Sequence, residues 1–396
     1  MSVSSGEDLT ELATAAMLDL RHPIKTGTAE WARRELGKGD LVAADRDSTF
    51  AADDWRRCAE RGILGLFTDE RYGGAGADLI TALLTLEGLG LGCPDNGLTF
   101  AVVSQLFSTQ STLDRFAGDE QRERWLPGLC DGSLLGAFAI TEPDSGSDVY
   151  AMASTALPDG EGRYRLSGHK AYLTFGSRCD VVVVFAATNP DAGRWGISAF
   201  LVPTDRDGVE RTGNREKMGM RTTPFGDIVF RDVALTDDDR IGPEGSGASI
   251  FHAVLERERA FVFAAQIGAM ERQLDRTIDY ARTRHQGGHP IGDYQAVAHR
   301  IVDMKVRHET ARLFMYKAAL LESRGQSITM AAALSKLVAS EHAMASSIDA
   351  VRTHGATGYV SEYEIERDLR DAVGGPVYSG TSDIQRNIVA RLLGLG

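Results

Sequence analysis

The feature that most constrains this chain is its hydrophobic period, which changes twice along the sequence. Up to about residue 130, apolar residues form long runs with few polar breaks, as in residues 79–90 and 98–107, and such runs are typical of buried helices. From about residue 131 to 245 the runs are short, β-rich and bounded by Gly, Asn and Asp, as in residues 180–187. From about residue 246 the helical pattern returns. The sequence therefore predicts a mostly α protein with a central, mostly antiparallel β domain.

These changes predict three domains. They are an N-terminal helical domain (residues 1–130), a middle β domain (131–245) and a C-terminal helical domain (246–396). The last should contain four or five long helices, broken near residues 286–290, 323–327 and 355–358. We expect the β domain to sit between two helical layers, and junctions of this kind are common ligand sites.

Composition excludes several classes of partner and site. The chain carries 43 Lys and Arg against 56 Asp and Glu, a net charge of −13, which opposes general binding to nucleic acid or an anionic membrane. Its four cysteines are far apart without a C-x-x-C pair, so we expect no metal site and no disulfide framework. The N-terminal MSVSSGEDLTELATAA lacks the pattern of a signal peptide, and no apolar run reaches the ~18 residues of a membrane span. A cytoplasmic protein is expected.

Glu258 is an unusual carboxylate for its position. If its segment is helical, its neighbours three, four and seven residues away are all apolar: Val254, Leu255, Phe261, Val262 and Ala265. A carboxylate on an apolar face is costly to ionise, so its pKa should rise, and such a group in a cleft can act as a general base. The alternative is a glutamate that pairs with an arginine of another helix.

Three further segments contain loops that can bind polar groups. Residues 141–148 (TEPDSGSD) combine hydroxyl side chains with Pro and Gly, residues 217–221 (KMGMR) form a glycine turn before a strand, and residues 378–385 (YSGTSDIQ) form a glycine turn that opens a helix. Each of them alone is equally typical of an ordinary capped turn.

Taken together in their order and spacing, these segments resemble the acyl-CoA dehydrogenase family of flavoproteins. The resemblance runs from about residue 50 to the C-terminus. It implies a fold with an N-terminal helical domain, a middle antiparallel β domain and a C-terminal four-helix-type bundle. The matching segments are residues 72–76, 141–148, 168–174, 217–221, 241–247, 280–286, 292–297, 370–372 and 379–385.

The resemblance implies FAD as the cofactor and a homo-oligomer, either a tetramer or a dimer. Residues matching those that line the isoalloxazine ring are Phe138, Ile140, Thr141 and Ser147, followed by Tyr172 in place of the usual Trp, and Thr174. Thr381 matches a C-terminal contact to the cofactor. Arg284 and Gln286 match residues that reach the FAD of a neighbouring subunit, although Gly287 replaces the usual aromatic residue there. Arg352 stands where the family has a Gln near the FAD diphosphate, a place where a charge can meet a phosphate.

The family's common catalytic glutamate is Ser379 in this chain, and a serine cannot accept a carbon-bound proton at neutral pH. Isovaleryl- and long-chain-type members carry the base on another helix, in a Glu-Arg pair before an apolar run, and Glu258-Arg259 fits that pattern. The resemblance therefore implies Glu258 as the base. It implies that the main-chain N–H of Ser379, with a ribityl hydroxyl of FAD, supports the thioester oxygen. Because only its backbone is invoked, we expect Ser379→Ala to cost far less than Glu258→Gln.

The implied reaction is α,β-dehydrogenation of an acyl thioester on a carrier protein or on CoA, with an electron-transfer flavoprotein or oxygen as the electron acceptor. Residues 87–93, the Glu258 helix continuing into residues 270–274, residues 346–352 and residues 379–383 are together similar to members that oxidise prolyl groups on peptidyl carrier proteins in secondary metabolism. The alternatives are an ordinary dehydrogenase for a short or branched acyl-CoA, a flavin oxidase or monooxygenase, and a non-catalytic flavin-binding protein.

Overall fold

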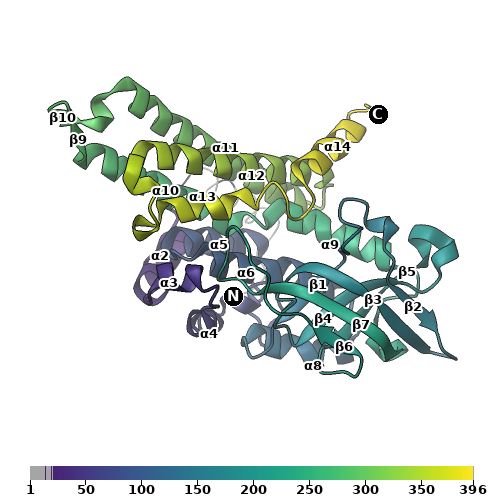
Figure 1. Cartoon of the computed structure of the whole chain (residues 1–396). Helices are drawn as coiled ribbons and strands as arrows, with labels where there is room; N and C mark the ends of the chain where they lie inside the picture. Colours follow the sequence, from purple (N-terminus) through teal and green to yellow (C-terminus); the bar gives the residue numbers. More distant parts are fainter. Residues whose placement is uncertain (1–13, 15–18, 20, 396) are drawn as a thin grey trace.

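The computed structural model describes residue 14, residue 19 and residues 21–395 (Figure 1). The N-terminal segment on which we judged the signal peptide lies almost wholly outside the described residues. Helices, then strands, then helices follow one another along the chain, so the predicted fold class is confirmed. Among the described residues, no helix is both long enough and apolar enough to span a membrane.

The N-terminal part is helical, and its long apolar runs are buried as predicted. Asp53 and Asp54 lie in the first turn of α4, where carboxylates favour the helix dipole. The run at residues 98–107 is not one regular helix, because a π-helical turn follows α6. The helices are α2 (Pro23–Glu35), α3 (Leu41–Arg46), α4 (Ala52–Glu60), α5 (Leu79–Gly92), α6 (Asn96–Ser104), the π-helix η3 (Gln105–Gln110), α7 (Ser111–Phe116) and α8 (Asp119–Cys130).

One sheet forms the middle of the chain, in the order β6-β7-β3-β2-β4-β5-β8, with β1 also pairing with β4. Only β1 and β2 run parallel to β4, so the sheet is mostly antiparallel, as predicted. The strands are β1 (Gly136–Ala139), β2 (Thr155–Pro158), β3 (Arg163–Thr174), β4 (Val181–Ala187), β5 (Ile197–Pro203), β6 (Val209–Arg211), β7 (Phe225–Thr236) and β8 (Arg240–Ile241).

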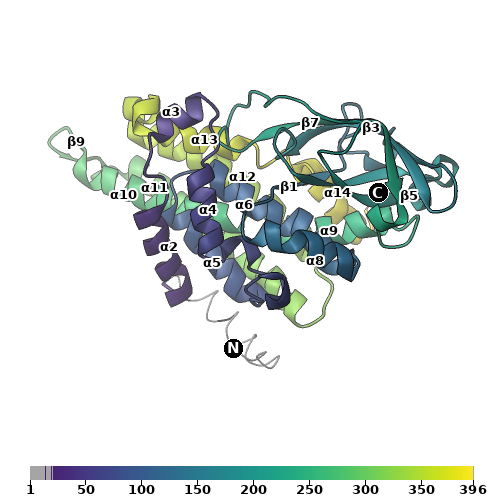
Figure 2. The same ribbon diagram turned by 90° about the horizontal axis from the view of Figure 1, so that it is seen from below.

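The layers differ from the expected arrangement in one respect. Val181 and Val183 on β4 pack in one cluster with Leu126 of α8 and with Phe251 and Val254 of α9 (Gly247–Phe261). Helices from both helical parts therefore cover the same face of β4 (Figure 2). The alternate residues Val182, Val184 and Ala186 belong to the other large core cluster, which also holds side chains of β3 and β7 and of the N-terminal helices.

The C-terminal part confirms the three expected breaks and adds one. The remaining elements are α10 (Ala264–Thr283), the short strands β9 (His285–Gln286) and β10 (His289–Pro290), α11 (Gln295–Ser323), α12 (Thr329–His354), α13 (Ile365–Val373) and α14 (Ser382–Leu392). The additional break separates α9 from α10 at Val262 and Phe263, in an apolar run without Gly or Pro. Phe263 stacks there on Tyr378, with ring centroids 5.4 Å apart, so tertiary packing stabilises this break.

A fully buried carboxylate joins the N-terminal helices to the bundle. Glu87 on α5 binds Lys25 Nζ (2.8 Å), Arg312 Nε (2.6 Å) and the Tyr316 hydroxyl (2.8 Å). Lys25 also bonds Glu271. Glu87, Glu271 and His308 lie close enough together to bind a metal ion, but the Lys25 ammonium already takes the place of a cation between the two carboxylates.

Candidate active site

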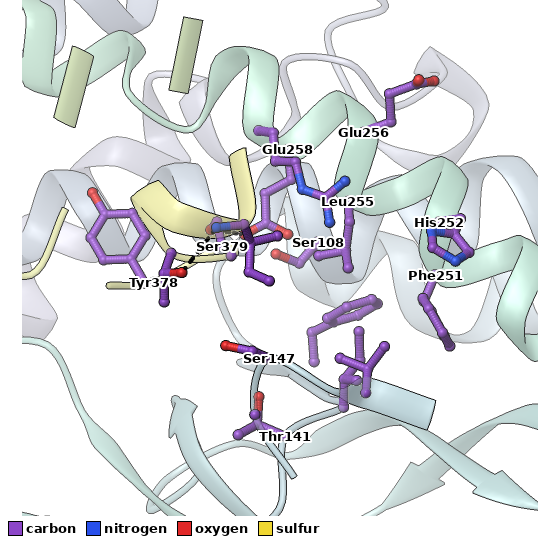
Figure 3. A pocket seen from close by; sticks show the side chains of 18 of the residues that line it. Ser108, Thr141, Ser147, Phe251, His252, Leu255, Glu256, Glu258, Tyr378 and Ser379 are labelled. Carbon is purple, nitrogen blue, oxygen red and sulfur yellow. Dashed lines mark hydrogen bonds between the residues drawn. The ribbon is translucent and has the colours of Figure 1, made fainter. Parts of the chain in front are cut away.

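A cavity of about 1110 Å³ lies where the sheet meets α9, α12 and the loop before α14. Its walls come from all three parts of the chain: α6 and η3, the ends of β1 and β3 with the loop at residues 141–150, and the C-terminal helices (Figure 3). A cavity of this size, enclosed by separate elements, suits a large cofactor together with part of a substrate.

Glu258 points into this cavity from α9 and is only 8% exposed. Its apolar helical neighbours pack into the core, as the spacing predicts. Burial raises the pKa of the Glu258 carboxyl, and the hydrogen bond from Ser379 and the nearby charge of Arg259 oppose that shift. No Lys or Arg of the described chain forms an ion pair with Glu258, so the predicted alternative, a glutamate paired with an arginine of another helix, is wrong.

Ser379 lies in the loop before α14, facing Glu258. Its hydroxyl donates a hydrogen bond of 2.5 Å to Glu258 Oε1. The residue has a φ of 54°, in the left-handed region that non-glycine residues rarely adopt, and Gly380 follows with a φ of 83°. On one side Tyr378 is held between the rings of Phe100 (4.7 Å) and Phe263, and on the other side Thr381 caps α14 through its hydroxyl. These anchors hold Ser379 in its unusual conformation.

Ser108 is a residue of the site that our sequence analysis missed. It lies in the π-helix η3, is buried, and points toward the carboxyl group of Glu258. A π-helical turn changes the direction of the side chains that follow it, and such turns are frequent at functional sites. The only available signal was the hydroxyl-rich stretch at residues 108–112, which ends an otherwise apolar run.

The loop at residues 141–148 contributes hydroxyl groups on the opposite side of the cavity. Its Glu142 side chain is turned inward and accepts hydrogen bonds from Ala153 N (2.6 Å), Ser154 N (3.0 Å) and Lys170 Nζ (2.8 Å). This anchor fixes the loop, whose Thr141 and Ser147 line the cavity across from Glu258 (Figure 3).

Tyr172 forms an aromatic part of the same wall. Its ring is 51% exposed, its φ is 61°, and its backbone N–H donates to Asp227 Oδ1 at 3.1 Å. The Arg215 guanidinium lies 4.9 Å from the ring centroid. An accessible ring held in this way beside hydroxyl groups fits a flat polar ring system such as the isoalloxazine of FAD.

The structure brings together most of the predicted cofactor residues, but not all of them. Those that line the cavity with Glu258 and Ser379 are Phe138, Ile140, Thr141, Ser147, Tyr172, Thr174 and Thr381. Arg284 and Gln286 lie apart from it, exposed at the hairpin of β9 and β10 beyond the end of α10 (Figure 1). Arg352 on α12 also lies outside the cavity, and its Nη1 is 3.6 Å from Asp349 Oδ1.

Three domain families match the chain in succession. They are the acyl-CoA dehydrogenase N-terminal domain at residues 22–133, the middle domain at 137–233 and the C-terminal domain at 245–394. The chain belongs to the acyl-CoA dehydrogenase family. As a member of this family it is an FAD-dependent acyl thioester dehydrogenase, and the cavity described above has the aromatic and hydroxyl groups that this cofactor needs.

Some of the most similar acyl-CoA dehydrogenase relatives act on carrier proteins. An L-prolyl-[peptidyl-carrier protein] dehydrogenase of Pseudomonas fluorescens is 42% identical over 87% of this chain and 91% of its own length. One from Serratia sp. is 38% identical over 86% of this chain and 88% of its own length. Among solved structures, the prolyl acyl carrier protein oxidase AnaB superposes with a TM-score of 0.92 at 38% identity, covering 94% of this chain and 98% of AnaB.

Three more residues at the cavity, the hydrogen-bonded pair Tyr150 and His252 and the single Arg259, were not predicted as parts of this dehydrogenase site. The Tyr150 hydroxyl and His252 Nε2 are hydrogen bonded to each other and join the loop at residues 141–150 to α9. Arg259 lines the cavity beside Glu258, and its buried Nε has no hydrogen-bond partner within the described chain.

Proposed function

We propose that this protein oxidises an L-prolyl group held as a thioester on a peptidyl carrier protein, with Glu258 as the base that removes the α-proton. One structural observation carries the proposal: a buried carboxylate with a raised pKa faces a large cavity whose opposite wall fits a flavin. The prolyl group and the carrier protein are supported by the relatives, which include two L-prolyl-[peptidyl-carrier protein] dehydrogenases.

The residues of the chain supply a proton acceptor and a hydrogen-bond donor. Glu258 in its ionised form accepts the α-proton, and its raised pKa brings its basicity closer to what general-base catalysis at neutral pH requires. The backbone N–H of Ser379 forms no hydrogen bond within the described chain, so it is available to the thioester oxygen as negative charge develops there. The chemistry that FAD would supply at this site is acceptance of the β-hydrogen as hydride. The residues that would hold FAD are Phe138, Ile140, Thr141, Ser147, Tyr172, Thr174 and Thr381.

The end of the cavity beside Glu258 suits a short or cyclic acyl group. The rings of Phe100 and Tyr378 form part of this wall, and Tyr378 is in turn backed by Phe263. Closely packed aromatic rings leave little room for a long alkyl chain without disturbing the core.

We also propose that the protein is a homo-oligomer whose Arg284, Gln286 and Arg352 serve a cofactor site shared between subunits. Within one chain these side chains lie outside the cavity. This position is the one expected of residues that reach the cofactor of a neighbouring subunit. We place the protein in the cytoplasm, because the four cysteines are buried and free, which suits a reducing compartment.

Anaerobic reduction of the FAD-loaded protein tests the proposal. L-prolyl carrier protein, butyryl-CoA and isovaleryl-CoA are each mixed with the enzyme, and bleaching of the flavin is followed. We expect bleaching with the prolyl carrier protein, and mass spectrometry of the carrier then shows whether one or two pairs of hydrogens are removed. Bleaching by an acyl-CoA alone would assign the ordinary family activity, and no bleaching by any thioester would show a non-catalytic flavin-binding protein. Reoxidation by oxygen or by an electron-transfer flavoprotein identifies the acceptor.

A further inference from the structure

Two serine hydroxyls from separate parts of the chain lie beside the carboxylate of Glu258. Ser379 comes from the loop before α14 and donates to Oε1 at 2.5 Å, while Ser108 comes from the π-helix η3 and its side chain points toward the same carboxylate. Both serines also line the cavity (Figure 3). Among the described residues no cation forms an ion pair with this carboxylate, and Arg259 acts on it only through its nearby charge.

The hydrogen-bonding capacity of these serines is only partly used. A serine hydroxyl has one proton to donate and two lone pairs that accept, whereas an ionised carboxylate only accepts. With Glu258 ionised, as a base must be, the hydroxyl proton of Ser379 points to it. Neither Ser108 Oγ nor Ser379 Oγ accepts a hydrogen bond from any described residue. Two acceptor oxygens therefore remain next to the base.

An ordinary acyl chain cannot use these acceptors, since it carries only C–H groups next to its α-carbon. A substrate with an N–H group on that carbon can donate to one of them. The charge of the site favours a neutral N–H over an ammonium, because Arg259 beside Glu258 already balances the charge of the carboxylate.

We propose that Ser108 and Ser379 determine substrate class: Ser379 donates its proton to Glu258, and both serines offer an oxygen to an N–H group on the substrate α-carbon. The pair thereby selects α-amino acyl thioesters with an uncharged amine over simple acyl thioesters. This inference rests on the proposed dehydrogenation at this site and adds the reason for its choice of acyl group.

The test compares two acyl groups of the same shape on one carrier protein, L-prolyl and cyclopentanecarbonyl, of which only the first has the N–H. The FAD-loaded wild type, Ser108→Ala and Ser379→Ala are measured by the rate of flavin reduction under kcat/KM conditions. Any effect of a serine on Glu258 itself changes both rates alike and cancels in their ratio. We expect each substitution to lower the ratio of prolyl to cyclopentanecarbonyl rates about tenfold, the effect of one lost hydrogen bond.

Ser249→Ala is the matched control, since Ser249 lies at the cavity without contacting Glu258, and its ratio should equal that of the wild type. Flavin content and melting temperature identify a variant that fails to fold. In that case, the rate ratio of the other serine variant tests the proposal. An unchanged ratio, with both rates reduced equally, would show that the serines only hold Glu258 and would overturn this proposal alone. If neither thioester reduced the flavin of the wild-type enzyme, that result would overturn the proposed function and this inference together.

Discussion

The hydroxyl of Ser379 donates a 2.5 Å hydrogen bond to Glu258 across 121 residues of sequence. Our sequence analysis assigned a role only to the main-chain N–H of Ser379, at the position where related enzymes commonly carry their base. The structure adds a role for the Ser379 side chain. Ser379 occupies the position of the base in related enzymes, and here its hydroxyl contacts Glu258, which we propose as the base of this chain. The two positions are therefore coupled, and a substitution at one should change the behaviour of the other.

Glu258→Gln should abolish substrate-dependent flavin bleaching. Gln keeps the shape of the side chain and an oxygen that can accept from Ser379, but it cannot accept the α-proton, so we expect the rate of flavin reduction to fall about a thousandfold. FAD content and oligomeric state should not change. Glu256→Gln, two residues away on α9, is the control and should lose less than tenfold. Retained activity in Glu258→Gln would rule out this residue as the base.

The pH dependence of flavin reduction should shift in Ser379→Ala. Burial raises the pKa of Glu258 and the Ser379 hydroxyl lowers it, so removal of the hydroxyl should raise that pKa further. Since Glu258 must be ionised to act, the rate rises with pH through its pKa, and the acidic limb of the profile should move to higher pH. Single-turnover rates from acidic to neutral pH measure this limb. A limb at the same pH as in the wild type would mean that the hydroxyl does not affect ionisation of the base.

Asp371→Ala should destabilise the fold and weaken the site. This buried carboxylate accepts from the Met220 backbone N–H and from Asn96 Nδ2 at 3.1 Å, so it joins segments before, within and after the sheet. Its loss leaves the buried Met220 N–H without a partner and Asn96 Nδ2 with only its bond to Asp368, which costs about 2 kcal/mol in the free energy of unfolding. We also expect slower flavin reduction, because α13 leads directly into the loop that carries Ser379.

Denaturant unfolding of Asp371→Ala should be compared with Asp383→Ala. Asp383 lies in an exposed ion pair with Arg386 on α14, where little stability is at stake. The first variant should unfold at lower denaturant and the second should match the wild type. Equal stability of both variants would contradict the role of Asp371 as a junction between the three segments.

Glu87→Ala should be strongly destabilising although Glu87 is remote from the cavity. The substitution leaves the buried charges of Lys25 and Arg312 without this carboxylate, and loss of one partner from such a group costs about 3 kcal/mol. Glu309→Ala removes a partner of Lys305 on the outer part of α11 and should have little effect. Melting temperatures of the two variants check this contrast, and similar values would show that Glu87 contributes little to the junction of α5 with the bundle.

The hydrophobic period alone predicted the succession of helices, sheet and helices. The period of a segment reflects which of its own faces are buried, and this depends on residues that are close in sequence. It also predicted the burial of Glu258, since its helical neighbours pack into the core whatever they meet there. Period could not predict the break at Val262 and Phe263. That break depends on the ring of Tyr378, more than a hundred residues further along the chain.

By itself the sequence determined which elements form, which faces they bury, and that a carboxylate would lie among apolar side chains. Only the tertiary structure decided what lies at this carboxylate: the hydroxyl of Ser379, which donates to it, the side chain of Ser108, which faces it, and no ion-paired arginine from another described helix. It also decided that Arg284, Gln286 and Arg352 lie outside the cavity that the other predicted cofactor residues share. The reason is physical: helix and strand formation depend on neighbours in sequence, whereas the partner of a buried polar group is whatever donor packing brings within about 3 Å of it.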